Sequence, residues 1–445
     1  MYTTAGERKG RAAILYFEQV RDLFLRILPG TLHNPLPVRI VAFHNDKEYE
    51  PFRATEFAVA YYLGSDSRDY VVMSSIDSDD YPATIHEYIH LLINHAGLKV
   101  PPWLNEGLAD VYSTLEPDRG KILIGNPMPG RLRVLGQEKW IDLERLTGVT
   151  QTSPEYNESK RAGMFYAESW LLTHMLYLGD KYQPKFNVFF QNLLETNSAE
   201  QSFQKAYGVS LREVERDLRQ YMRGANVNLG VFQAKLQKPS ELPVGQPATR
   251  FESDIVLADL FTLLRKRDQA GQIYDRLAKE DPNRWELQSA IAYLAWRNGE
   301  RLAARDHFAR AAELGSTDGQ MYFDYAKLLQ GDSSKDQPLE DALGKALQLR
   351  PDLTKARVLL GLHYYNVQRY GLAVATMNQV KHLTPDQAPS VFLAMAYSQL
   401  KLGNRPEAKT NAEKAKQFAK SAEQIDAADQ VLKFLKGSQD SETQP

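Results

Sequence analysis

Cysteine is absent from this chain of 445 residues. Its absence excludes a disulfide framework, a zinc site with cysteine ligands and a cysteine nucleophile. It leaves the cellular compartment open, because a chain without cysteine tolerates oxidising and reducing surroundings alike.

An excess of one charge is also missing. The 54 basic and 56 acidic residues give a formal net charge of −2, which is too small to attract nucleic acid or an anionic membrane surface. Every long apolar run is interrupted by charged residues before it reaches the ~20 residues that a bilayer span requires. We therefore expect neither a nucleic-acid partner nor a membrane span.

The chain divides into two regions with different patterns, as its length favours two to three domains. The stretch 237–247, QKPSELPVGQP, has three prolines and one glycine and no helical or strand period, which indicates a linker. We predict a mixed domain over residues 1–225, a linker over 226–250, a helical repeat domain over 251–437 and a disordered tail over 438–445.

Small residues recur in the second region at an almost constant interval. Steps of 34 or 35 residues separate Ala258, Ala292, Ala326, Gly361 and Ala396. Twelve positions after four of these residues the chain again has alanine, and the third repeat deviates at Leu339. Prolines follow the expected second helices at positions 282, 351 and 385. This pattern predicts helix-turn-helix units in which the small residues lie where two helices touch.

Such units of about 34 residues resemble the tetratricopeptide repeat. The resemblance implies an all-α solenoid of about five repeats over 251–420, with a capping helix over 421–437. Arrays of this kind hold peptides or protein partners in a concave groove. The aromatic residues of the repeats include candidates for that surface, although most aromatics at helical spacing belong to the core.

The first region mixes both kinds of secondary structure. Residues 6–28 have apolar positions at helical spacing, and the runs 38–43, 57–63 and 70–76 are rich in β-forming residues between turn residues. From Pro82 to about residue 224 the pattern is helical almost throughout. We therefore expect a small N-terminal sheet with one helix, followed by a helical subdomain.

His86, Glu87 and His90 form the pattern H-E-x-x-H at the start of this helical stretch. Side chains four residues apart leave a helix on one face, so both imidazoles can share one tetrahedral metal ion. Glu87 lies beside that face, where it can reach a metal-bound water. The alternative is a structural role, in which two buried histidines are satisfied by backbone carbonyls.

A carboxylate in a suitable position follows twenty residues later. Pro101 and Pro102 predict the end of an extended connection and the start of a second helix. Glu106, in the sequence WLNEGLAD, can supply a third ligand and leave the fourth position open for water, as in catalytic zinc sites. Asp110, one helical turn further on, can accept a hydrogen bond from a ligand histidine and orient it.

The sequence H-E-x-x-H, followed after a short connection by N-E-x-x-x-D, resembles the gluzincin zinc peptidases. The resemblance covers roughly residues 35–225 and is concentrated in four short motifs. It implies an α+β catalytic domain with Zn2+ held by His86, His90 and Glu106, while Asp110 orients His86. It further implies that Glu87 is the general base for hydrolysis of a peptide bond.

The sequence FYAESW at 165–170 contains the candidate for stabilising a tetrahedral oxyanion. Together with AYGVS at 206–210, it is similar to the peptidase-MA-like bacterial families, several of which also carry tetratricopeptide repeats. This similarity implies that Tyr166 stabilises the oxyanion. Tyr166 could instead be an aromatic residue of the core, and His174 is then the second candidate for stabilising the oxyanion. For His95 we predict only an interaction with the helix dipole.

The predicted strand over 70–76 directly precedes the metal helix. In gluzincins an edge strand there pairs with extended substrate, so the resemblance implies the same role here. Related proteins are often exported, and we expect an exported or periplasmic location by analogy. The first residues, MYTTAGERK, show no apolar signal segment, so this expectation assumes that a leader was lost. A cytoplasmic location fits the residues almost as well.

Three functions fit these observations. The first is a zinc peptidase whose repeats recruit a protein or peptide substrate or a protein partner. The second is a tetratricopeptide scaffold whose peptidase-like domain holds metal without catalysis. The third is a metal hydrolase that acts on a bond other than a peptide bond. Glu87 has no duty in holding the metal, and its presence favours an enzyme over a scaffold.

Overall fold

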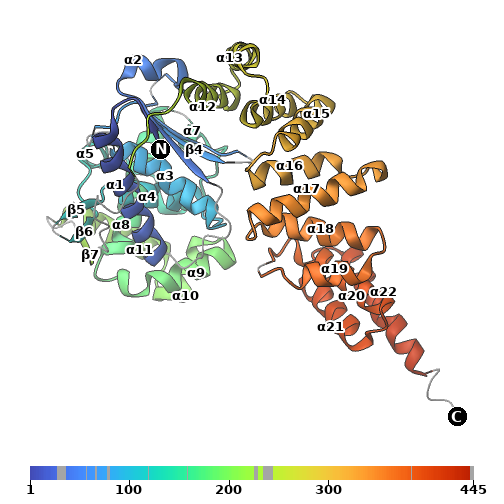
Figure 1. Cartoon of the computed structure of the whole chain (residues 1–445). Coiled ribbons are helices and arrows are strands. Elements are labelled where there is room, and N and C mark those ends of the chain that lie inside the picture. Colours follow the sequence, from blue (N-terminus) through green and yellow to red (C-terminus); the bar gives the residue numbers. More distant parts are fainter. Residues whose placement is uncertain are drawn as a thin grey trace. The chain divides into compact units, whose positions relative to one another are not determined.

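The computed structural model describes the chain in two compact units (Figure 1). The first unit comprises Met1–Val256 with Leu263–Lys266, and the second comprises Leu257–Thr262 with Arg267–Pro445. The description leaves out residues 28–36, 57, 66–67, 78–80, 119, 158, 225–228, 234–243, 382 and 441–445.

A four-stranded sheet forms the first part of the first unit, with the strand order β1-β2-β4-β3. Strands β1 (Tyr2–Thr3), β2 (Val38–Ala42) and β4 (Asp69–Met73) are parallel, and β3 (Ala60–Leu63) is antiparallel to β4. Valine and isoleucine dominate the centre of β2 and β4, because branched side chains pack well on a pleated, buried surface.

The position of β4 corrects one expectation. The strand predicted over 70–76 was expected at the sheet edge, whereas β4 lies between β2 and β3 and is buried along its whole length. The short β3 covers it by antiparallel pairing, from Ala60 with Met73 to Leu63 with Tyr70. The edge strand beside the metal helix is therefore β3.

Helix α3 (Tyr81–His95) follows β4 and carries the H-E-x-x-H sequence. Its apolar face is buried through Ile85, Ile89 and Ile93, because residues at positions i, i+4 and i+8 share one face of a helix. Just beyond the end of the helix, Gly97 adopts φ +65° at little steric cost because it lacks a side chain. Helix α1 (Glu7–Ile27) packs against α3 within the same core.

Helix α4 (Pro102–Ser113) carries the second half of the metal motif. Pro101 is extended with φ −65° and ψ 155°, so the two prolines start the helix as predicted. Helix α4 packs closely on α8 (Ser159–Leu178) at Gly107. A Cβ at Gly107 would lie 2.4 Å from the carbonyl oxygen of Ser169, so only glycine permits this approach.

A second sheet was not predicted. Strands β5 (Glu116–Asp118), β6 (Lys121–Ile124) and β7 (Gly230–Gln233) form an antiparallel sheet within regions expected to be helix and linker. Strands of three or four residues are too short to show a period of two, and β7 joins from more than a hundred residues away. Most of the predicted linker stretch 237–247 lies outside the described residues.

The remaining helices of the first unit are short or amphipathic. They are α2 (Asp46–Tyr49), η1 (Glu50–Phe52), α5 (Pro129–Gln137), α6 (Leu143–Thr147), α7 (Pro154–Asn157), η3 (Gln183–Lys185), α9 (Phe186–Thr196), α10 (Ala199–Tyr207) and α11 (Leu211–Arg223).

The AYGVS sequence at 206–210 lies between two of these helices. Gly208 ends α10 in the left-handed conformation, and Ser210 starts α11 by forming a capping box with Glu213. The pattern therefore has a local structural role as a helix stop and start.

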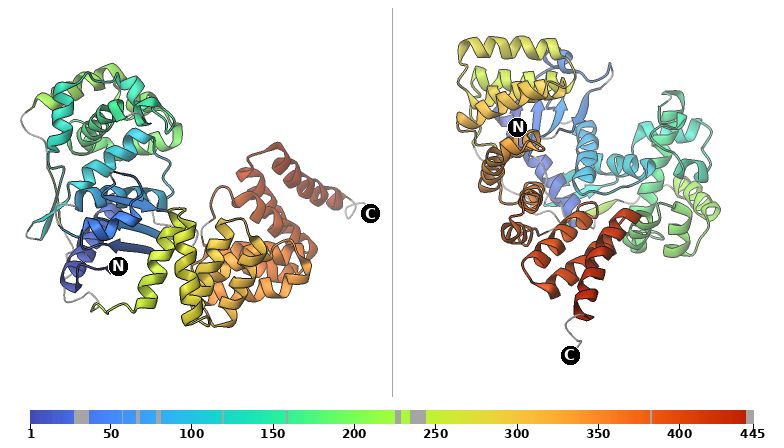
Figure 2. Two further views of the ribbon diagram at one scale, coloured as in Figure 1. Left: turned by 90° about the horizontal axis from the view of Figure 1, so that it is seen from above. Right: turned by 90° about the vertical axis from the view of Figure 1, so that its right-hand side faces the viewer.

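The second unit is an all-α array of helix pairs, which confirms the predicted solenoid (Figure 2). The first helices of the pairs begin every 34 or 35 residues, and the first of them, over Arg250–Leu263, has residues in both units. The pairs are α12 (Arg250–Leu263) with α13 (Arg267–Glu280), α14 (Trp285–Arg297) with α15 (Arg301–Glu313), α16 (Gly319–Leu329) with α17 (Asp336–Leu349) after the turn η5 (Ser333–Lys335), α18 (Thr354–Asn366) with α19 (Tyr370–Met377), and α20 (Ala388–Lys401) with α21 (Arg405–Phe418).

The small residues of the repeats lie where the helices touch. Ala258, Ala292, Ala326 and Ala396 are fully buried. A Cβ at Gly361 would lie 2.6 Å from the Cγ of Met377 on the paired helix. The last helix, α22 (Ala422–Asp440), extends three residues into the segment predicted to be disordered, and residues 441–445 lie outside the description.

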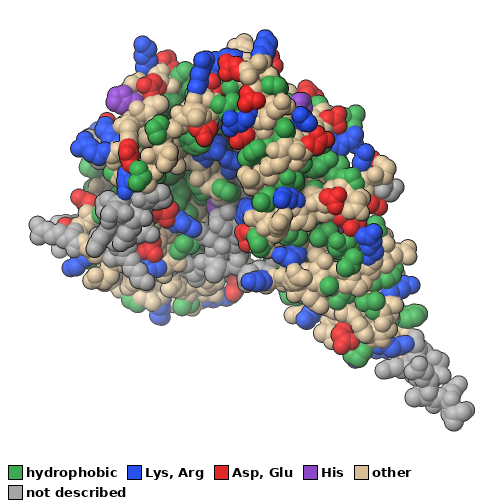
Figure 3. Space-filling model, in the orientation of Figure 1, with side chains coloured by type: hydrophobic (Ala, Val, Ile, Leu, Met, Phe, Trp, Pro, Cys, Tyr) green, Lys and Arg blue, Asp and Glu red, His purple; other side chains and the backbone are tan. Residues whose placement is uncertain are grey.

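Charged side chains of both signs are interspersed over the face of the molecule drawn in Figure 3. This mixture matches the balanced composition and gives no broad field of one sign on that face. Within the described part of the chain, no helix is both long enough and apolar enough to cross a membrane.

Candidate metal centre

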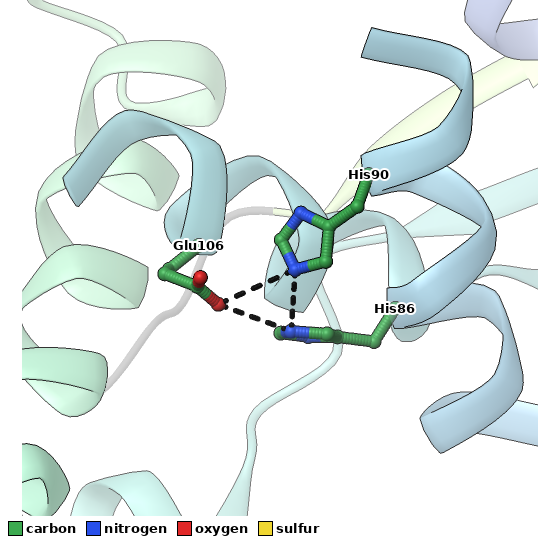
Figure 4. A group of neighbouring side chains, drawn as sticks. All are labelled: His86, His90 and Glu106. Atoms are coloured by element: carbon green, nitrogen blue, oxygen red, sulfur yellow. Dashed lines mark hydrogen bonds and ion pairs between the residues drawn. The ribbon is translucent and has the colours of Figure 1, made fainter. Parts of the chain in front are cut away.

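The three predicted ligands lie together at the junction of α3 and α4. His86, His90 and Glu106 offer ligand atoms within 4.8 Å of one another, and Figure 4 shows their side chains converging from the two helices. The Nε2 atom of His86 lies 3.1 Å from Nε2 of His90 and 3.1 Å from Oε2 of Glu106. Among the described residues, no other group of three such side chains is arranged in this way.

The helices themselves bring about this convergence. The buried isoleucines of α3 fix its rotation in the core, so both imidazoles leave on the adjacent, less buried face. The rings of His86 and His90 meet edge to face at 4.7 Å. Glu106 is almost fully buried, with 3% of its surface exposed. The close contact of α4 with α8 at the next residue, Gly107, determines where Glu106 lies.

The donor set fits a zinc ion. In the neutral form of the ring, the Nδ1–H of His86 donates to Oδ1 of Asp110 at 2.9 Å, and Nε2 has a lone pair. This lone pair faces an oxygen of the Glu106 carboxylate, which is also an acceptor. Electron-rich atoms at this separation repel each other unless positive charge lies between them. Two imidazole nitrogens and one carboxylate are ligands that Zn2+ prefers in catalytic sites.

The pKa values show how strongly this centre attracts positive charge. Burial lowers the pKa of His86, but its bonds and charge interactions with Asp110 and Glu106 outweigh burial and raise it to about 10. Burial raises the pKa of Glu106, yet the two histidines hold it well below its usual range. A divalent cation would take the place of the proton that the carboxylates otherwise hold at His86.

Asp110 is held by Arg131 on its other side. The Nε of Arg131 donates to Oδ2 of Asp110 at 2.8 Å, and its Nη2 donates to Oδ1 at 3.2 Å. Asp110 is 2% exposed, so this forked bond fixes the carboxylate that orients His86. Sequence reasoning missed Arg131, since it lies in no motif and 21 residues from its partner.

Tyr156 is a second residue that the sequence did not reveal. Its hydroxyl donates to Oε1 of Glu106 at 2.8 Å, so the oxygen of Glu106 that faces away from the histidines is also fixed. The contact spans 50 residues and carries no local signal. Tyr156 thus supports the third ligand as Asp110 supports the first.

Tyr166 and Glu87 lie near the same centre. The Arg131 guanidinium lies 5.1 Å from the centre of the Tyr166 ring. Burial raises the pKa of Tyr166 to about 12, and the charges of Glu106, Asp110 and Glu87 add to the effect. The charge of Glu87 also contributes to the raised pKa of Tyr156. Glu87, which is half-buried, is thus close enough to both tyrosines to act on their titration.

The two other histidines of interest have structural partners. His174 is fully buried, with Nδ1 at 2.8 Å from the hydroxyl of Tyr221 and Nε2 at 2.9 Å from the carbonyl oxygen of Gly125. Both nitrogens are thus engaged, which argues against His174 as the reserve oxyanion donor. His95 pairs with the buried Asp69 at the start of β4, and the helix-dipole prediction did not include this interaction.

No protein-family model matches the chain, and no curated protein matches it either. Among solved structures the chain is similar to YrrB, described as a TPR protein with an unusual peptide-binding site, at 19% identity over 40% of this chain and 90% of YrrB, with a TM-score of 0.35. It is also similar to TTC0263, a thermophilic TPR protein of Thermus thermophilus, at 19% identity over 40% of this chain and 97% of that one, with a TM-score of 0.26.

PilF of Pseudomonas aeruginosa is a third similar structure, at 19% identity over 41% of this chain and 83% of PilF, with a TM-score of 0.32. Identities and TM-scores this low carry no inference about function. The interval and pairing of the chain's own helices identify the second unit as a tetratricopeptide-type solenoid.

Proposed function

We propose that this protein is a zinc-dependent peptidase of the gluzincin type. One observation carries the proposal: His86, His90 and Glu106 converge with their ligand atoms within 4.8 Å of one another. Glu87 lies next to them in the chain and has no duty in holding the metal. A purely structural metal site would not need an acid at that position.

Each residue has a distinct role in the proposed reaction. Zinc held by the three ligands would polarise a substrate carbonyl and lower the pKa of a coordinated water towards ~7. Glu87 accepts the proton of the attacking water and returns it to the leaving amine. Tyr166, with a pKa raised to about 12, keeps its proton at neutral pH and donates a hydrogen bond to the developing oxyanion.

The sheet edge offers a site for the substrate backbone. Strand β3 is at the edge of the four-stranded sheet and packs beside α3. An extended peptide could add to this edge through main-chain hydrogen bonds, which would lay its carbonyls near the metal helix. We assign this role to β3, in place of the interior strand β4.

The repeats provide a separate surface for a partner. A groove of about 610 Å³ lies between the last two helix pairs, lined among others by Phe392, Phe418 and Lys414. Its volume is in the range of ligand-binding sites. This groove also supports a second candidate function, in which the chain is a repeat scaffold that binds a peptide or protein and its metal-holding unit is inactive.

The test compares wild type with Glu87→Gln. Both proteins are purified with zinc, their metal content is measured by mass spectrometry, and both are incubated with a mixed peptide library. We expect about one zinc per chain in each, because Glu87 is no ligand, and loss of cleavage by about a hundredfold or more in Glu87→Gln, because the general base is gone. Gln retains the size of Glu and so controls for packing.

The other outcomes separate the two candidate functions. Zinc in both proteins with cleavage by neither would favour the scaffold. Absence of zinc after metal-replete purification would refute the metal centre itself. Equal cleavage by both proteins would remove Glu87 from the mechanism.

A further inference from the structure

Helix α19 is much shorter than the other second helices of the repeat array. It has 8 residues, whereas α13, α15, α17 and α21 have 13 or 14. At 1.5 Å of rise per residue, the difference corresponds to about 8 Å of helix. Residues 378 and 379 form a turn after α19, and the next helix, α20, begins at Ala388.

The groove of about 610 Å³ lies where α19 ends. Helix α19 packs against α20, which packs against α21 (Figure 1), and residues of all three line the groove. Met377 and Asn378 are among them, so a helix that continued past Met377 would run into this space. Among the described lining residues, those from first helices all belong to α20. The groove therefore differs from a surface that successive first helices build together.

Large apolar side chains line the groove from all three helices and from the segment after α19. They include Met377, Val380, Leu383, Phe392, Met395 and Phe418. The rings of Phe392 and Phe418 are stacked with their centres 5.9 Å apart, and Phe418 is 40% exposed. A partner that covers these rings removes apolar surface from water, which favours binding.

The charge of the lining is positive. The nearby Lys416 is paired with an aspartate, whereas Lys381 and Lys414, which line the groove, form no ion pair among the described residues. The Nζ of Lys414 lies 5.4 Å from the centre of the Phe392 ring, so this charge lies beside the apolar surface. One acid, Glu407, lines the groove against the two lysines. A partner with carboxylates next to its apolar residues complements this arrangement.

The other polar side chains of the groove leave few groups for the backbone of a ligand. Thr410 and Asn411 donate to backbone carbonyls of their own helix at 3.1 and 2.9 Å. Gln399 accepts from Asn404 at 2.7 Å. An extended peptide would find few partners here for its main-chain N–H and C=O groups, whereas a helix satisfies these groups internally. These contacts favour a helical ligand.

We propose that this groove binds an amphipathic helix of a protein partner, with large apolar residues on one face and acidic residues beside them. The partner helix would lie where the last turns of α19 are missing. Its apolar face would cover Phe392 and Phe418, and its carboxylates would lie near Lys381 and Lys414. The proposal rests on the proposed role of the repeats as a partner surface, and it does not depend on the metal centre.

The test measures the binding of designed helical peptides to the full chain. The chain carries Glu87→Gln so that the peptides stay intact. The probes are three series of fluorescent, alanine-rich peptides of about 15 residues, a length at which such helices begin to form. The first has leucines on one face and glutamates at varied positions beside them, the second has lysines in place of the glutamates, and the third has alanines in place of the leucines. Fluorescence anisotropy gives the Kd of each.

One pair of variants tests where the peptides bind. Thr410→Phe places a large side chain in the groove, and Gln417→Phe is the matched control, because Gln417 is exposed on the same helix and does not line the groove. We expect the leucine–glutamate peptides to bind more tightly than the other two series. Thr410→Phe should weaken this binding by more than about tenfold, because the space is filled, and Gln417→Phe should leave it unchanged.

A second pair of variants tests the charge of the partner. Lys414→Glu should weaken binding of the glutamate peptides by about tenfold and strengthen binding of the lysine peptides. Lys409→Glu changes the net charge equally from an exposed position outside the groove and should change neither by much. A gain in affinity for the lysine peptides cannot result from misfolding.

The remaining outcomes would overturn the proposal. Failure of every leucine–glutamate peptide to bind at ~1 mM, or binding that Thr410→Phe leaves intact, would refute the groove as a helix site. Equal affinities of wild type and Lys414→Glu for both charged series would refute the acidic partner.

A chelator separates this proposal from the peptidase. Binding in the groove should be unchanged when zinc is removed. Binding that is lost with the chelator and persists in Thr410→Phe would place the peptides at the metal centre, which overturns the groove and leaves the peptidase intact. Groove binding by a protein whose wild type holds no zinc and cleaves nothing would support the groove and refute the peptidase.

Discussion

Asp110 shows how one residue connects the metal centre to the rest of its unit. One of its oxygens accepts from His86 and Arg131, and the other accepts from Arg131 alone. Because the carboxylate is buried, its charge is balanced locally by the guanidinium. The position of a ligand imidazole therefore depends on a residue of α5 that touches no ligand itself.

Glu168 is another buried acid, and it lies outside the metal motif. It is 1% exposed and its Oε1 accepts from the backbone of Ile141 at 2.8 Å. Burial raises the pKa of Glu168 to about 8. Between pH ~4.5 and 8 the unfolded chain ionises this group while the folded chain keeps it protonated, so its contribution to stability falls as the pH rises.

We predict that Glu168→Gln stabilises the protein at pH 8 and has little effect at pH 5. Gln retains an oxygen for Ile141 but cannot ionise, so the free energy of unfolding should rise at pH 8 by more than about 1 kcal/mol, because each pKa unit corresponds to ~1.4 kcal/mol. Urea denaturation at pH 5, 6.5 and 8 measures this difference.

Glu213 provides a control, because its contribution to stability changes with pH in the opposite direction. Hydrogen bonds from Ser210 lower the pKa of this exposed capping residue, so its contribution to stability is present above pH ~4.5 and is lost as the pH falls. Glu213→Gln should therefore destabilise the protein at pH 8 and matter less in acid. A gain in stability for Glu168→Gln that does not grow with pH would contradict the assignment.

At the scale of elements, the contact of α4 with α8 determines where Glu106 lies. The two helices approach so closely at Gly107 that a Cβ would lie 2.0 Å from Oγ1 of Thr173 and 2.4 Å from the carbonyl oxygen of Ser169. The second contact is with backbone and cannot be relieved by a rotamer change. The small residue next to the third ligand therefore has a packing role.

We predict that Gly107→Ala lowers the free energy of unfolding by about 1–3 kcal/mol, the usual range for overpacking a core, and weakens zinc binding. The helices must separate, which moves Glu106 away from the two histidines. Chemical denaturation and competition with a chelator measure the two effects.

Gly163→Ala on α8 is the matched control, because a Cβ there meets no atom within 4 Å. It should be neutral or stabilising by up to about 1 kcal/mol. The double variant Gly107→Ala with Thr173→Ala should recover little, since the Ser169 carbonyl remains. Full recovery would show that the Thr173 side chain alone limits the approach.

At the scale of the whole molecule, every residue of the candidate metal centre belongs to the first unit. The second unit has its own buried clusters around the helix-pair contacts. Metal bound to the folded first unit stabilises that unit by mass action. It adds no contact to the core of the repeats.

We predict that zinc raises the midpoint temperature of one unfolding transition, that of the first unit, and leaves that of the repeats unchanged. At a zinc concentration of ~1,000 times the dissociation constant, the first unit should gain about 4 kcal/mol. Differential scanning calorimetry with zinc and with a chelator shows which transition shifts. The variant Gly361→Ala crowds Met377 in the repeats, so the transition whose midpoint temperature it lowers is that of the second unit. An unchanged trace with and without zinc would argue against the metal centre.

The sequence alone determined those features that depend on local periodicity. His86 and His90 share a face because they are four residues apart on one helix, and Asp110 follows Glu106 by one turn for the same reason. The repeats could be predicted because the same small residues recur at a nearly constant interval. Zinc binding and catalysis by these residues remain predictions.

Only the tertiary structure revealed the contacts between segments that are distant in the chain. Arg131 and Tyr156 reach the metal centre across 21 and 50 residues, and β7 joins β6 from beyond the helical subdomain. The sheet order made β3 the edge strand beside the metal helix. Such contacts depend on how the elements pack together, so they cannot be predicted from a local pattern of residues.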